Sequence, residues 1–130
     1  MKTEINFFDA SVYTSSLKCA VQKTGKIGFT DYTQRKLEMK AGMSARIGVA
    51  GTIEQYDHLV MQFLDTVEPD AFKLNKAGNY YYLNPKALLD ELNIPYKTQS
   101  IQYDMQLIDQ DRNIYKLNKK EGRVQNEESE

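Results

Sequence analysis

Positively charged side chains are concentrated in the first half of this chain. Residues 17–47 contain seven basic and two acidic residues, a net charge of +5, whereas the whole 130-residue chain has a formal charge of −1. A local surplus of Lys and Arg can neutralise phosphates, and this neutralisation supplies much of the affinity of nucleic-acid binding. The cluster therefore indicates a nucleic-acid surface, with an ordinary solvated face as the alternative. The basic residues are Lys18, Lys23, Lys26, Arg35, Lys36, Lys40 and Arg46.

Three consecutive tyrosines, Tyr80, Tyr81 and Tyr82, could stack on nucleic-acid bases. In a strand, however, successive side chains point to opposite faces, so Tyr80 and Tyr82 share one face and Tyr81 takes the other. We therefore expect at least one of the two faces to belong to the core.

Residues able to perform catalysis are scarce. Cys19 is the only cysteine and is expected to be a small core residue, because it lies in an apolar strand. His58 is the only histidine and is expected at the surface beside Asp57. Asp109 and Asp111 lack the following glycine and glutamate of a calcium loop, so a hairpin turn explains them better. The sequence predicts no enzyme, no metal site and no cofactor.

The composition is that of an ordinary globular domain. Hydrophobic residues make up 41% and charged residues 27% of the chain. At 130 residues, one domain with a modest core is expected. No apolar run approaches a membrane span, and the first residues do not resemble a signal peptide, so a cytoplasmic protein is predicted.

The elements that must position the basic residues are short. We expect strands over residues 17–22 and 26–29 around a turn at Gly25, since glycine tolerates the positive φ of a tight reversal. Thr30 or Asp31 should cap a helix over residues 32–39, with Gln34, Arg35 and Lys36 directed to solvent. A strand over residues 44–50 follows. The spacing in residues 56–64 fits a helix or a strand, and we choose the strand.

The second half repeats this order after a connector at residues 68–70. Strands are expected over residues 72–75 and 80–83 around Lys76-Ala77-Gly78, and Asn84 followed by Pro85 predicts a helix start. Leu88, Leu89 and Leu92 should face inward, and Lys86, Asp90 and Glu91 outward. Strands over residues 100–108 and 114–117 complete the half.

The two halves therefore share a β-β-α-β-β order. Gly25 and Gly78 are 53 positions apart and Leu37 and Leu92 are 55 apart, which indicates a duplication with a two-residue insertion. A unit this small cannot bury a core alone, so we expect a mainly β fold with two short helices, in which tandem units interlock into one small barrel. The predicted organisation is an N-terminal arm at 1–16, repeats at 17–65 and 71–117 forming one domain over 17–117, and a disordered tail at 118–130.

This pattern resembles the AbrB/SpoVT swapped-hairpin family, and two copies in one chain resemble the MraZ arrangement. The resemblance rests on three segments of the first half: residues 23–29 (KTGKIGF), Arg35-Lys36-Leu37 and Lys40-Ala41-Gly42. The family usually places a proline at the end of the second strand, where this chain has Thr30 and Leu83. The second half also has Asn79 where a basic residue is usual, and Asp90-Glu91 near the end of its helix.

The resemblance implies a DNA-binding transcriptional regulator that contacts duplex DNA through its first repeat as a homodimer or higher homo-oligomer. Arg35 could read a guanine bidentately. The alternative is a non-enzymatic protein-interaction module, antitoxin-like or part of an assembly, in which exposed tyrosines or the N-terminal arm contact a protein partner. The nucleic-acid-binding residues that the resemblance implies are Lys23, Lys26, Arg35, Lys36, Lys40 and Arg46.

Overall fold

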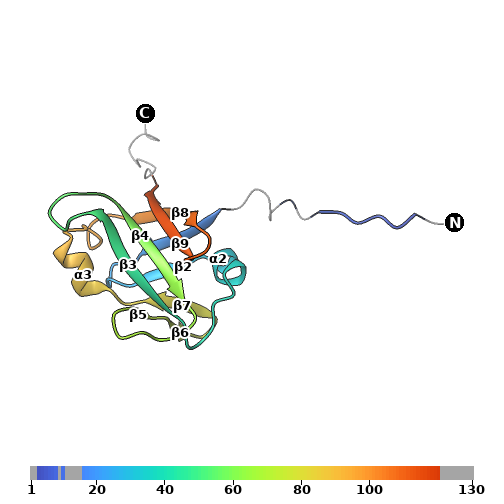
Figure 1. Cartoon of the computed structure of the whole chain (residues 1–130), viewed down its shortest axis with the longest axis horizontal. Helices are drawn as coiled ribbons and strands as arrows, with labels where there is room; N and C mark the ends of the chain where they lie inside the picture. The colour runs from blue at the N-terminus through green and yellow to red at the C-terminus, as the bar shows by residue number, and fades with distance from the viewer. Residues whose placement is uncertain (1–2, 9, 11–15, 121–130) are drawn as a thin grey trace.

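The computed structural model describes residues 3–8, 10 and 16–120, and these residues form a mainly β structure with two short helices (Figure 1). The strands of the first half are β1 (Leu17–Val21), β2 (Ile27–Phe29), β3 (Ser44–Gly51) and β4 (Tyr56–Leu64), with α2 (Asp31–Lys36) between β2 and β3. Those of the second half are β5 (Phe72–Lys73), β6 (Asn75–Ala77), β7 (Tyr80–Leu83), β8 (Ile101–Asp109) and β9 (Ile114–Lys119), with α3 (Lys86–Glu91) between β7 and β8.

All nine strands belong to one antiparallel sheet that curls into a nearly closed barrel. The order is β5-β3-β4-β9-β8-β1-β2-β7-β6. The two edge strands, β5 and β6, are consecutive in the chain and are separated only by Leu74. Leu74 is buried, and its backbone N–H donates to the carbonyl of Met43 at 3.0 Å. A single bent segment thus supplies both edges of the sheet.

Every second strand pairing joins the two halves of the chain. β1 pairs with β8, β2 with β7, β3 with β5 and β4 with β9, all antiparallel. The inward side chains of both halves meet in one core, where the Phe63 ring contacts Phe29 and Tyr115 edge to face, with centroids 5.9 and 5.7 Å apart. Since both halves contribute strands and core residues, neither can bury its apolar face without the other.

The N-cap residues of α2 and α3 differ in whether they supply a side-chain hydrogen bond. Thr30 is the N-cap of α2, and its side chain accepts a hydrogen bond from the Thr33 N–H, as expected. Pro85 is the N-cap residue of α3 and provides no side-chain bond, so Asn84 does not cap this helix. The two helices lie on opposite sides of the barrel in Figure 1. Neither of these described helices is long and apolar enough to cross a membrane.

Other details of the sequence prediction are corrected by the fold. The helix expected over residues 32–39 covers Asp31–Lys36, because Glu38 takes a positive φ of 52° and ends it. The strand expected over residues 72–75 is two short strands, β5 and β6, because the chain leaves the β3 edge at Leu74 and then pairs with β7. The second hairpin therefore turns at Gly78 and Asn79. Residues 56–64 form the strand β4, as chosen.

The boundaries of the barrel extend slightly beyond the expected ones. β9 continues to Lys119, two residues past the predicted end of the domain. The rest of the predicted tail, residues 121–130, lies outside the described residues, as do residues 1–2, 9 and 11–15 of the predicted arm. Residues 3–8 extend away from the barrel (Figure 1).

Candidate nucleic-acid interface

The predicted basic residues occupy two ends of the β1–β2 hairpin and one further strand. Lys23 lies in the hairpin turn and Lys26 directly before β2. At the other end, the hydroxyl of Thr33 in α2 accepts a hydrogen bond from the Lys18 N–H at 2.8 Å. This bond fixes α2, and with it Arg35 and Lys36, at the end of the hairpin opposite the turn. Lys40 follows α2 in an exposed segment, and Arg46 lies in β3.

The charges of these residues are compensated to different degrees. Arg46 donates to the Asp70 carboxylate at 2.9 Å and to the Gln62 side-chain oxygen at 3.1 Å, and the pKa of Asp70 is lowered because Arg46 hydrogen-bonds to it. The Arg35 Nε lies 3.0 Å from an Asp31 carboxylate oxygen, but both side chains are about three-quarters exposed (73% and 76%). Such an exposed ion pair is weak, so we expect Arg35 to be able to leave Asp31 for another anion. Among the described residues, Lys23, Lys36 and Lys40 form no ion pair.

Gln34 holds α2 against the second half of the chain. Its amide nitrogen donates to the Asn79 carbonyl at 3.2 Å, and its side-chain oxygen accepts from the Tyr81 N–H at 2.7 Å. Gln34 is 7% exposed, so the expectation that it faces solvent is wrong. Helical periodicity placed it beside Arg35 on a polar face, but a buried amide with both groups bonded is stable.

The turn of the first half contacts the helix of the second half. A Cβ added at Gly25 would lie 2.7 Å from the Cγ of Lys86, and Gly25 has a φ of +89°. Lys86, a residue that the sequence had not marked for binding, therefore lies beside the Lys23 turn. Its ammonium group is 3.3 Å from the Asp90 carboxylate, which reduces its availability to an anion.

The Asp90 carboxylate is also bonded by a phenol. The Tyr96 hydroxyl donates to it at 2.6 Å, and this bond, together with Lys86, lowers the pKa of Asp90. Because the pKa of Asp90 is lowered in the folded protein, its interactions stabilise the fold at pH values above the ordinary carboxyl pKa of about 3.8. This stabilisation is lost as the pH falls through the folded-state pKa.

We expect Tyr96→Phe to raise the pKa of Asp90 toward 3.8, because the largest cause of the lowering is removed. Carboxyl chemical shifts followed by NMR between pH 2 and 6 would measure this. An unchanged Asp90 titration in the variant would show that Lys86 alone is responsible, and Lys86→Gln is the matched comparison.

An aromatic and basic cluster lies on the outer face of the sheet. The Tyr80 and Tyr82 rings stack with centroids 6.0 Å apart and an angle of 21° between their planes. The Lys26 ammonium lies 4.6 Å from the centre of the Tyr82 ring, and the Gln22 amide donates to the Tyr80 hydroxyl. Tyr81 shares a face of β7 with the fully buried Leu83 and packs against the core, so one face of this strand belongs to the core, as expected. Tyr80 and Tyr82 lie on the other face and are half-buried.

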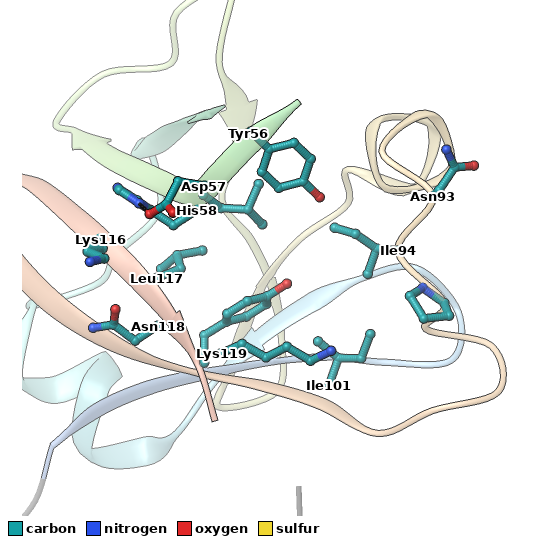
Figure 2. A pocket seen from close by; sticks show the side chains of 13 residues that line it. Tyr56, Asp57, His58, Asn93, Ile94, Ile101, Lys116, Leu117, Asn118 and Lys119 are labelled. Atoms are coloured by element: carbon teal, nitrogen blue, oxygen red, sulfur yellow. Dashed lines mark hydrogen bonds and ion pairs between the residues drawn. The ribbon is translucent and has the colours of Figure 1, made fainter. Parts of the chain in front are cut away.

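A hollow of about 410 Å³ opens at one end of the barrel, between β4, β9 and the segment that follows α3 (Figure 2). Figure 2 shows Tyr56, Ile94 and Ile101 around this hollow, with His58, Asp57 and Lys116 grouped at its β4–β9 side. The His58 ring nitrogen is 2.7 Å from Asp57, and this bond lowers the Asp57 pKa. The lone histidine thus lies at the surface, as expected.

Two buried side chains keep their protons at neutral pH. Burial raises the pKa of Cys19 to about 12, so its sulfur remains a protonated core thiol. Burial also raises the pKa of Tyr103, which lines the hollow, to about 12. Within residues 3–8, 10 and 16–120, no group of three or more His, Cys, Asp or Glu side chains could hold a metal ion.

Comparisons of the chain with protein-family models, with curated proteins and with solved structures gave no match.

Proposed function

We propose that this protein is a DNA-binding transcriptional regulator of the AbrB/SpoVT type, built from two copies of one swapped-hairpin unit. The observation that carries the proposal is the reciprocal strand pairing. If β5 and β6 are counted together as the first strand of the second half, the first strand of each half pairs with the third strand of the other, through β1–β8 and β5–β3. Like strands also pair across the halves, β2 with β7 and β4 with β9. An exchange of this kind follows when a unit too small for its own core shares one with its copy.

The ends of the two helices support the duplication. Leu37 and Leu92 are the C-cap residues of α2 and α3, and in both the backbone φ and ψ are close to −85° and 0°. Each is followed by a residue in the left-handed conformation, Glu38 (φ 52°) and Asn93 (φ 60°). Both pairs of residues are 55 positions apart, in agreement with the spacing on which the predicted duplication rests.

The N-caps support the same spacing. Thr30 and Pro85 begin α2 and α3 and are also 55 positions apart. The two-residue insertion relative to the glycine turns therefore falls between Gly78 and α3. On this alignment Pro85, rather than Leu83, corresponds to the family's usual proline position, and Thr30 replaces it in the first half.

The proposed contact surface is the first half of the chain. Lys23 and Arg35 project from opposite ends of the β1–β2 hairpin, which at about 3.3 Å per residue spans on the order of 20 Å. This exceeds the roughly 12 Å width of the major groove, so the two ends would contact phosphates on both sides of a groove. Arg35 and Lys36 lie on the exposed side of α2, because Gln34 holds the opposite side. A homodimer or higher assembly would place several such surfaces along one duplex.

We expect Arg35→Ala with Lys36→Ala to weaken duplex binding on the order of 10- to 100-fold, since one contact able to read a base and one phosphate contact are removed. The slope of log K against log salt should become less steep by about 0.9, the value for one lost phosphate contact, while the melting temperature stays nearly unchanged because both side chains are exposed. A gel-shift or anisotropy titration with random duplex DNA at several salt concentrations measures both quantities.

The matched control is Lys73→Ala with Lys97→Ala, which removes the same charge from exposed positions of the second half. Equal losses in the two double variants would indicate only net-charge attraction and would contradict the assigned surface. Absence of any duplex binding by the parent, even at low salt, would favour a protein-interaction module instead. That alternative is supported by Ile5 and Phe7, which are 69% and 91% exposed on the segment that extends from the barrel.

A further inference from the structure

The outer face of β1, β2 and β7 carries a depression that the proposed duplex contacts do not use. Gly28 of β2 lies opposite Ala20 of β1 and Tyr82 of β7. Ala20 provides a small residue at the floor, and Gly28 leaves room for the hydroxyl end of Tyr80 beside it. The Tyr80 ring covers Gly28, where any Cβ would overlap it. The depression measures about 250 Å³, and Thr30, Lys18, Gln102 and Tyr80 are among the side chains around it.

The positions of these residues along the strands set the order of the stack. Side chains alternate along a strand, so Gly28 in β2 shares one face with Lys26, directly before the strand, and Thr30, directly after it. Lys26 lies over Tyr82, and Tyr82 stacks on Tyr80. Thr30 and Lys18 meet at the end of the hairpin opposite Lys26, where the Thr30 N–H donates to the Lys18 carbonyl at 3.3 Å, and both border the depression. Tyr80 borders the depression whereas Tyr82 is not among its lining residues, so Tyr80 is the member of the tyrosine pair that a ligand in the depression would contact.

We infer that this depression binds an unpaired base of a single-stranded nucleic acid, stacked on Tyr80. The ring is already oriented by Tyr82 and by the hydrogen bond from Gln22, so little side-chain freedom remains to be lost on binding. The volume is below the roughly 300–1,000 Å³ of drug-sized ligand pockets, which suits one planar ring. Aromatic side chains beside cations on a rigid sheet are the usual elements of single-strand binding.

The charges around the depression suit a strand with phosphates. Lys18 borders it directly, and Lys26 lies at the far end of the tyrosine stack, so cations flank the aromatic row on both sides. One acidic residue, Asp104, lies opposite Lys18 in the register of β1 and β8, and its buried Oδ1 has no hydrogen-bond partner within the described part of the chain, so its charge reduces the local positive potential. The Gln102 amide at the rim can donate to and accept from the edge of a base.

The inference deepens the proposed nucleic-acid function but relies on other side chains than Arg35 and Lys36. The test is fluorescence anisotropy of a labelled ten-residue oligothymidylate at low salt. Tyr80→Leu should weaken binding on the order of 5- to 100-fold, because leucine keeps the apolar bulk but has no aromatic face. Tyr80→Phe should bind nearly as well as the parent. Lys26→Gln should lower the salt slope by about 0.7.

A second variant, Ala20→Leu, tests the same depression independently in case Tyr80→Leu does not fold. Ala20→Leu would fill the floor of the depression without changing any charge, and it should also weaken oligothymidylate binding while duplex binding persists. If Tyr80→Leu and Ala20→Leu bind as tightly as the parent, or if Tyr80→Phe loses as much as Tyr80→Leu, the inference is wrong. Failure of the parent to bind the oligonucleotide while shifting duplex DNA would overturn it and leave the proposed function standing.

A free nucleotide could offer the same base and phosphate. Thymidine monophosphate, titrated as a competitor of the labelled oligonucleotide, separates the two sources. We expect it to compete only at concentrations far above those of unlabelled oligonucleotide, because it offers one phosphate and one base. Competition by the mononucleotide at equal concentration would contradict a single-strand site.

Discussion

Leu89→Ala is expected to lower the free energy of unfolding by about 2–5 kcal/mol, the range observed for removing a buried leucine side chain. Leu89 is fully buried and is the side chain by which α3 joins the shared core. Alanine would leave a cavity that the surrounding strands cannot fill, since interiors are close-packed. Urea unfolding followed by circular dichroism would show a lower midpoint with an unchanged m-value.

Leu88→Ala provides the control on the same helix. Leu88 is only partly buried against the core, so its replacement removes the same number of atoms from a less enclosed site. The cost should be clearly smaller than for Leu89. Similar costs at the two positions would mean that α3 is not seated on the core through Leu89.

Gly25→Ala is expected to destabilise the fold by more than the 1–2 kcal/mol that a left-handed conformation costs an alanine. The new Cβ would lie 2.7 and 2.8 Å from side-chain carbons of Lys86 and 3.2 Å from its Cα. Because the last of these atoms is backbone, α3 would have to move away from the turn, which adds to the conformational cost. Thermal and urea unfolding measure the total.

The corresponding glycine of the second half isolates that additional cost. Gly78 also has a positive φ, +63°, but a Cβ there would meet nothing within 4 Å. Gly78→Ala should therefore show the conformational cost alone. The difference between the two variants measures how closely the first turn contacts the second helix, and no difference would contradict that contact.

The fold class could be predicted because its signals are local. The strand over residues 56–64 was preferred to the competing helical spacing because the second half has a strand at the corresponding place, and the side chain of Thr30 marked the start of α2. The spacing of Leu37 and Leu92 correctly predicted two equivalent helix ends. A helix cap depends on residues only a few positions apart, and a repeat is visible as a recurring spacing, so both can be recognised in the sequence.

The sequence could not predict the surroundings of the residues on α2 and β3, because these depend on how strands of the two halves pair. Gln34 had the periodicity of a solvent-facing residue, yet it is buried because Asn79 and Tyr81, 45 and 47 positions away, supply its hydrogen bonds. Arg46 belonged to the same charge cluster as Arg35, yet β3 carries it to Asp70 and Gln62. Neither partner could be identified from neighbouring residues.

The amino-acid sequence alone determined the strands, the two short helices, the glycine turns and the surplus of positive charge in the first half, because backbone conformation and charge follow from residue type. Only the tertiary structure decided that the basic residues divide between two ends of a hairpin, and that Tyr80, Tyr82 and Lys26 form one row beside a depression. These arrangements arise from contacts between residues more than 50 positions apart, such as Gly28 with Tyr82, and register between distant strands is set by packing of the whole core.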